Sequence, residues 1–122
     1  MEYITVAEII EIHNEIIKRY GGTRGIRDEG TLQLLAYKIN REKDIFRRAA
    51  LALHMIAVGH PFFDGNKRTA FAMAENELGE AGHYFDAGTE EVIDLMRDIA
   101  EYKCSLKAVE KRIKGLARSH IG

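Results

Sequence analysis

The sequence predicts an all-α fold, a single-domain bundle of about six helices. Apolar residues recur at intervals of three and four over most of the chain, and helix-capping residues precede several of these segments. No stretch shows the strict alternation of a half-buried strand, and no internal repeat or linker divides the sequence. The length of 122 residues suits one hydrophobic core, so residues 1–122 are expected to form one domain.

The first two helices are predicted from a cap and two apolar stripes. Thr5 and Glu8 fit a capping box, and the apolar stripe that follows ends near Tyr20, where two glycines offer a C-cap. A glycine-rich loop follows, GGTRGIRDEG. The second helix is expected to begin after Gly30 and to end near Ile39.

The third helix is expected to begin near Lys43 and to be central, because it is apolar on most sides. Pro61 ends it, since the residue before a proline is pushed out of the α region. We therefore expect His60 to be extended, with its imidazole facing outward. The fourth helix is predicted over residues 65–81, with small alanines that allow close packing against the third.

The C-terminal part is predicted as a short connector and two helices. Residues 83–85 form an extended connector, Thr89 caps a fifth helix that ends near Tyr102, and Ser105 caps a sixth that ends near Arg118. The last residues, 119–122, are expected to fray.

Composition excludes several classes of protein. Hydrophobic residues make up 46% of the chain and charged residues 30%, which indicates a soluble globular protein and not a disordered one. The formal net charge of −1 favours neither direct nucleic-acid binding nor a membrane surface. The one cysteine, Cys104, excludes an internal disulfide. With no signal-peptide pattern and no apolar run of ~18 residues, we expect a cytoplasmic protein.

The stretch GHPFFDGNKR, residues 59–68, carries the candidate chemistry. It places a turn directly before the fourth helix, whose first N–H groups are unpaired and attract anions. Gly65 lets a phosphate approach the backbone, Asn66 can donate to an oxygen, and Lys67 and Arg68 add two positive charges. These four residues are therefore candidate phosphate or nucleotide ligands. A Walker loop is excluded, because GxxxxGK[ST] is absent.

Asp64 does not fit a pure anion site, because it would repel a phosphate. A Mg²⁺ ion shared with a nucleotide such as ATP resolves this conflict, since Mg²⁺ takes one or two carboxylates plus phosphate oxygens. His60 could then take a proton from a hydroxyl group. Base, metal ligand and cations in one loop point to phosphoryl or nucleotidyl transfer.

Each of these residues also has a plain structural explanation. His60 could cap the third helix, Asp64 could cap the fourth, and Lys67 and Arg68 could be solvated. Cations in the first turn of a helix are unfavourable, however, because the helix dipole prefers anions there. Their presence indicates a bound anion, so the combination favours function over structure alone.

The motif HPFFDGNKR resembles the HxFx(D/E)(G/A)N(G/K)R signature of the Fic/Doc (Fido) superfamily, and the chain is most similar to its Doc, or death-on-curing, branch. The RYGG element near residue 20 also resembles Doc sequences, and the resemblance covers essentially the whole chain. It implies a six-helix fold, in agreement with the helix count from periodicity.

The resemblance implies a role for each residue of the motif. It implies that His60 is the catalytic base, that Phe62 anchors the loop and that Asp64 binds Mg²⁺. The candidate phosphate ligands, by the same resemblance, are Gly65, Asn66 and Arg68.

Lys67 bears on the type of reaction, because most Fic proteins have glycine there and Doc proteins have lysine. In Fic proteins AMP is transferred, whereas the Doc branch moves the γ-phosphoryl of ATP to a threonine of elongation factor Tu and blocks translation. Fic motifs also often carry a second arginine where this chain has Phe71. The resemblance therefore favours a protein Ser/Thr kinase, with AMP transfer and a non-catalytic binding module as the alternatives.

No intact (S/T)xxxE(G/N) inhibitory motif is present, because the nearest match, Ser105 to Glu110, is one residue too long. Self-inhibition is therefore not expected. The resemblance instead implies a toxin–antitoxin system, in which a separate Phd-like antitoxin restrains the toxin. Arg27 and Asp28, in the glycine-rich loop, are possible positioning residues or simply solvated ones.

Overall fold

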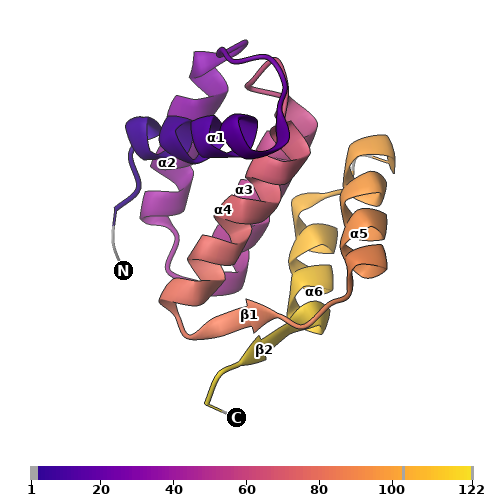
Figure 1. Cartoon of the computed structure of the whole chain (residues 1–122). Helices are drawn as coiled ribbons and strands as arrows, with labels where there is room; N and C mark the ends of the chain where they lie inside the picture. The colour runs from indigo at the N-terminus through magenta and orange to yellow at the C-terminus, as the bar shows by residue number, and fades with distance from the viewer. Residues whose placement is uncertain (1–2, 103, 122) are drawn as a thin grey trace.

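The computed structural model describes residues 3–102 and 104–121, and these residues form the expected all-α bundle (Figure 1). The helices are α1 (Val6–Tyr20), α2 (Glu29–Arg41), α3 (Ile45–Gly59), α4 (Asn66–Glu80), α5 (Thr89–Tyr102) and α6 (Leu106–Leu116). Two short strands, β1 (His83–Phe85) and β2 (Ala117–Ser119), complete the described part of the chain.

Side-chain caps set the starts of α1, α2, α3 and α6. Thr5 and Ser105 cap α1 and α6 as predicted, each accepting a hydrogen bond from a backbone N–H in the first turn. The start of α2 was expected too late, because Asp28 accepts from the Thr31 N–H and brings Glu29 into the helix. Asp44 likewise caps α3, slightly after the expected start.

Helices α3 and α4 lie side by side at the centre of the bundle, with α1 and α2 on one side and α5 and α6 on the other (Figure 1). Ala70 and Ala74 are fully buried on α4, and small side chains there allow the two helix backbones to approach closely. A buried ion pair also joins them, since Arg48 Nε lies 2.7 Å from Glu77 Oε1. The pair of central helices therefore fixes how the loop between them, residues 60–65, is presented.

A small antiparallel sheet was not predicted. His83 pairs with Ser119 and Phe85 with Ala117, so the end of α6 is tied back to the connector after α4. The predicted extended connector is thus a strand, and α6 stops at Leu116 instead of near residue 118. The expectation of fraying is wrong for Ser119, and Gly122 lies outside the described residues.

No helix in the described part of the chain is long and apolar enough to cross a membrane.

Candidate functional site

The motif HPFFDGNKR, residues 60–68, forms the loop between α3 and α4 and the first turn of α4. Its first residue, His60, ends α3, and its N–H still donates to the carbonyl of Ile56 at 3.1 Å. The expectation of an extended His60 is wrong, because its φ and ψ are 48° and 59°. Pro61 ends the helix as predicted, but it does so through a left-handed cap.

The loop is anchored in the core by Phe62, which is 1% exposed. His13 on α1 stacks flat on Phe62, and its Nε2–H donates to the carbonyl of Asp64 at 2.7 Å. His13 is thus a buried residue of α1 that also holds the loop in place. The amide of Asn66 brackets the Phe62 backbone, accepting from its N–H at 3.0 Å and donating to its carbonyl at 2.9 Å. The side-chain amide of Asn66 therefore serves the shape of the loop.

The carboxylate of Asp64 is exposed at the site and is oriented by two backbone groups. Its Oδ1 accepts from the N–H of Gly65 at 3.2 Å, and its Oδ2 accepts from the N–H of Thr23 at 3.1 Å. The backbone of the loop before α2 lies very close to the Asp64 carboxylate. A Cβ at position 22 would be only 3.0 Å from Asp64 Oδ2, so glycine there permits this close approach. Each carboxylate oxygen keeps acceptor capacity for a further ligand.

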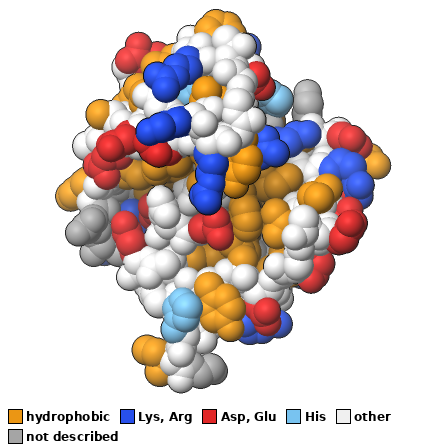
Figure 2. Space-filling view, viewed as in Figure 1, with side chains coloured by type: hydrophobic (Ala, Val, Ile, Leu, Met, Phe, Trp, Pro, Cys, Tyr) orange, Lys and Arg blue, Asp and Glu red, His pale blue; other side chains and the backbone are white. Residues whose placement is uncertain are grey.

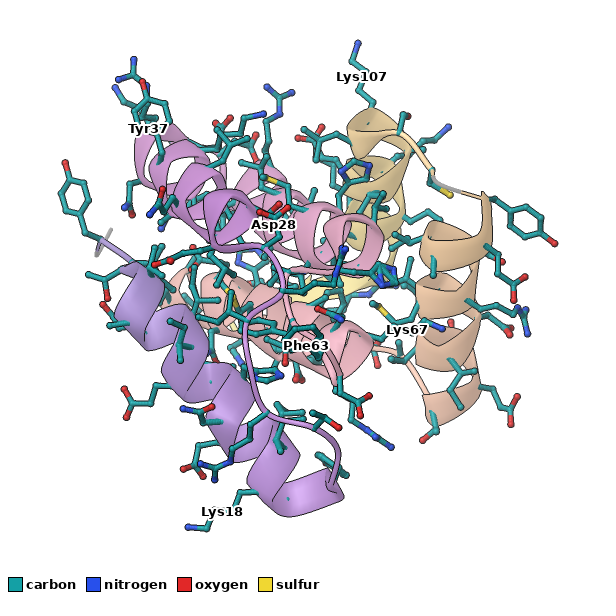
Figure 3. The ribbon with its side chains drawn as sticks, turned by 90° about the horizontal axis from the view of Figure 1, so that it is seen from above. Lys18, Asp28, Tyr37, Phe63, Lys67 and Lys107 are labelled. Carbon is teal, nitrogen blue, oxygen red and sulfur yellow. The ribbon has the colours of Figure 1, made fainter. Side chains whose placement is uncertain are left out.

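The first turn of α4 forms the cationic part of the site. Gly65 precedes the helix with a φ of 73°, a left-handed conformation that favours glycine, and its carbonyl accepts from the N–H of Thr69. The backbone N–H groups of residues 66–68 lie in the first turn of α4, where N–H groups have no intrahelical acceptor. Lys67 and Arg68 are exposed there, and the Arg68 guanidinium lies 4.3 Å from the centre of the Tyr20 ring. In Figure 3, Lys67 extends from α4 toward α5.

A groove of about 1020 Å³ joins these groups. Its walls come from the end of α1, the loop between α3 and α4, the exposed side of α4, and α5. Its lining includes the following motif residues: His60, Phe63, Asp64, Gly65, Asn66, Lys67 and Arg68. Beyond them the groove has apolar lining residues, Ile16, Phe71, Ala72, Val92, Ile93 and Met96, together with Tyr20 and four charged residues, Arg19, Glu75, Arg97 and Glu101. Figure 2 shows this apolar hollow between α4 and α5, bordered by basic side chains.

Two carboxyl groups beyond the motif, those of Glu75 and Glu101, line the groove. Glu75 lies two turns along α4 from the cations. The residue is exposed at the surface of the groove, and the partial burial of its carboxyl raises the pKa above its ordinary value of 4.5. The folded protein therefore disfavours the charged form of Glu75 compared with the same side chain in water.

The structure brings all six predicted site residues to one groove. Sequence reasoning missed Tyr20 and Glu75, because no local pattern marks an exposed tyrosine at a helix end or a carboxylate at mid-helix. It also missed the support that His13 and Thr23 give to the loop, since both contacts join residues more than 40 positions apart. The heptad-like spacing of Arg68, Phe71 and Glu75 was the available signal, as it places these side chains on one side of α4.

A family model described as the Fic/DOC family matches residues 3–78, which is more than half of the chain. The chain belongs to the Fic/Doc family.

Two relatives extend this result beyond the matched segment. The chain is 32% identical over 123 aligned residues to "Protein kinase doc" of Escherichia phage P1, with 95% of this chain and 96% of the relative covered. It is 31% identical over 107 residues to "Toxin Doc" of Mycolicibacterium smegmatis, with 80% and 82% covered. Both relatives carry the Doc name, as the resemblance of the motif to that branch predicts.

The Fic/Doc site can share a metal with a ligand but does not form a complete metal site by itself. The described residues contain no group of three or more His, Cys, Asp or Glu side chains that could hold a metal ion. Asp64 is the carboxylate beside the cationic first turn of α4, and one carboxylate plus phosphate oxygens is a typical Mg²⁺ environment. The donor set therefore fits a Mg²⁺–nucleotide complex better than a bare ion.

The carboxylate nearest to an inhibitory motif in the sequence is engaged elsewhere. Glu110 on α6 is 8% exposed and accepts from Arg47 Nε at 3.0 Å. It does not line the groove.

Proposed function

We propose that this Fic/Doc protein is a Doc-type toxin that transfers the γ-phosphoryl group of ATP to a serine or threonine hydroxyl of a target protein. The observation that supports the proposal is the groove, whose lining includes His60 and Asp64 together with Lys67 and Arg68 from the first turn of α4. A base next to a phosphate cradle is the minimum that transfer to a hydroxyl needs.

The proposed reaction is a direct displacement at the γ-phosphorus. The imidazole of His60 takes the proton of the target hydroxyl, whose oxygen forms a bond to the γ-phosphorus. The bond from this phosphorus to the β,γ-bridging oxygen breaks, and ADP leaves with that electron pair. The first-turn N–H groups of α4, with Lys67 and Arg68, stabilise the charge on the phosphate oxygens.

Asp64 is the proposed protein ligand of Mg²⁺, and its orientation by the Thr23 and Gly65 N–H groups supports this role. When bound, the ion neutralises charge on the phosphate chain.

The apolar half of the groove supports ATP as the substrate. Nucleotide sites are mostly apolar clefts with a few polar groups that fix orientation. Phe71, Val92 and Met96 provide such a surface next to the cationic end. We propose that the adenosine part lies there while the phosphates reach the N-terminus of α4.

Two partners belong to the proposal. The target is a protein of the translation machinery, with an elongation factor as the first candidate, and a Phd-like antitoxin restrains the toxin. Support comes from the Doc relatives, one of which is named a protein kinase and the other a toxin. A cytoplasmic location follows from such a target.

The test uses ATP labelled on either the γ- or the α-phosphate, with the purified protein, Mg²⁺ and a cell lysate. We expect a labelled protein only with the γ-label. Labelling from the α-position would instead identify AMP transfer, and no labelling from either would favour a binding module. Lys67→Gly is expected to increase any α-labelling, because the change removes bulk and charge from the cradle.

A further inference from the structure

The Arg27 side chain donates two hydrogen bonds to backbone carbonyls at the end of α3, one of which belongs to His60, the proposed base. The Nε of Arg27 donates to the carbonyl of His60 and its Nη2 donates to the carbonyl of Gly59, both at 2.8 Å. Carbonyls in the last turn of a helix have no intrahelical donor, and a cation there is favoured by the helix dipole. The planar guanidinium can satisfy two of them at once.

These two carbonyls lie on opposite sides of the His60 Cα. The Gly59 carbonyl belongs to the peptide plane before it, and the His60 carbonyl belongs to the plane after it. The backbone dihedrals of His60 describe how these two planes are rotated relative to each other. One guanidinium bonded to both planes therefore restrains φ and ψ of His60 together.

His60 needs such a restraint. It has a φ of 48°, and among the described residues it is the one non-glycine residue with a positive φ. Residues with a side chain rarely adopt this conformation, which persists where surrounding contacts enforce it. The direction of the Cα–Cβ bond, and with it the place of the imidazole, depends on these dihedrals.

Backbone contacts of residues 26–28 add to the restraint on the loop that follows His60. The N–H groups of Arg27 and Asp28 both donate to the carbonyl of Pro61, at 2.7 and 3.0 Å. Ile26 and Phe62 form an antiparallel bridge one residue further along. In Figure 3 the backbone that leads to Asp28 runs past Phe63, whose N–H donates to the carbonyl of Gly25 at 3.3 Å. Three consecutive carbonyls, those of residues 59–61, are thus held by residues 27 and 28.

We propose that Arg27 is a positioning residue, which holds His60 in the left-handed conformation that aims its imidazole into the groove. Its effect on catalysis rests on the proposed function, in which His60 is the base. Its effect on the backbone of His60 does not, so the two claims can be tested separately.

The first test is NMR spectroscopy of the full chain. At positive φ the amide proton and the Hα of a residue lie unusually close, which gives a strong intraresidue cross-peak. We expect this cross-peak for His60 in the natural protein and its marked weakening in Arg27→Ala. Arg27→Lys, which can still donate to a carbonyl, is expected to retain much of it. Arg24→Ala is the matched control from the same loop, because the Arg24 side chain makes no hydrogen bond or ion pair among the described residues.

The second test separates kcat from KM for the phosphotransfer, at a temperature where circular dichroism shows every variant folded. We expect Arg27→Ala to lower kcat on the order of tenfold to a hundredfold, since misplacement of a reacting group acts on the chemical step. KM for ATP should change little, and Arg27→Lys should recover part of the rate. An unchanged kcat, or a loss shared by Arg24→Ala, would overturn the proposal.

If the natural protein shows no phosphotransfer at all, the proposed function is refuted, and the NMR experiment alone tests the role of Arg27. That role is refuted if the His60 cross-peak of Arg27→Ala is as strong as that of the natural protein. Should Arg27→Ala fail to fold, the same comparison is made with Arg27→Lys, for which a partial weakening of the cross-peak is expected.

Discussion

His13 lies flat against Phe62, with the ring centroids 3.7 Å apart and the ring planes 3° from parallel, and its Nε2–H reaches the carbonyl of Asp64. A side chain of α1 thus holds the loop between α3 and α4 by ring stacking and a hydrogen bond, and the hydrogen bond joins residues 51 positions apart in the sequence. Because Asp64 is the proposed metal ligand, the position of that carboxylate depends on His13.

His13→Phe should isolate the hydrogen bond, since a second aromatic ring can still stack on Phe62. We expect a loss of about 1–2 kcal/mol in the free energy of unfolding, the usual cost of leaving a carbonyl without its donor. His13→Ala removes the stack as well and should cost about 1–2 kcal/mol more. Urea unfolding measures both. Equal stability of His13→Phe and the natural protein would show that the hydrogen bond contributes nothing.

Asn66→Ala tests the bracket around the Phe62 backbone. It leaves a buried N–H and a buried carbonyl without partners, so we expect unfolding free energy to fall by about 2–3 kcal/mol. Asn76→Ala, on an exposed turn of the same helix, is the control and should be neutral or slightly stabilising. A similar effect of the two substitutions would contradict the structural role of Asn66.

Glu77→Gln tests the ion pair between the central helices. Arg48 and Glu77 are 2% and 3% exposed, and the change leaves a buried guanidinium without its counter-charge. Burial raises the pKa of Glu77, and the hydrogen bond from Arg48 offsets part of that rise. We expect a loss of about 3 kcal/mol, within the range for breaking buried pairs. Glu80→Gln, exposed at the end of α4, is the matched control, and thermal unfolding of both variants supplies the comparison.

Glu75→Gln should change how stability depends on pH. Burial raises the pKa of Glu75 in the folded protein, so the folded state keeps this proton to a higher pH than the unfolded chain does. The contribution of Glu75 to stability therefore falls as pH rises from the unfolded pKa through the folded one. Relative to the natural protein, Glu75→Gln should therefore gain stability as pH rises above the ordinary range of a glutamate carboxyl.

Urea unfolding at several pH values measures this difference, and Glu15→Gln on an exposed turn of α1 provides the control. A pH-independent difference between Glu75→Gln and the natural protein would argue against a desolvated carboxyl in the groove.

Local patterns predicted most of the helical fold. The hydroxyls of Thr5 and Ser105 cap the helices that their sequence positions indicate, and Pro61 ends α3. The start of α2 was missed because Asp28 was taken as part of a loop, whereas its carboxylate caps the helix and hydrogen bonds from Thr31 lower its pKa. The sheet was missed because strands of three residues carry no readable alternation.

The candidate site was predicted as a list of residues, and its geometry was not. A continuous motif brings His60 to Arg68 together by chain connectivity alone. The left-handed backbone of His60 depends on Arg27, and the orientation of Asp64 depends on Thr23, so both are set by a loop more than 30 residues earlier. Sequence spacing within the motif contains no information on such contacts.

The proposed transfer of a γ-phosphoryl group to a protein hydroxyl depends on His60 as the base. Its most direct test is the intact mass of a purified elongation factor after incubation with ATP, Mg²⁺ and either the natural protein or His60→Ala, with His120→Ala, outside the groove, as control. We predict a phosphate adduct with the natural protein and with His120→Ala, and none with His60→Ala. An AMP adduct, or a phosphate adduct that persists with His60→Ala, would contradict the account.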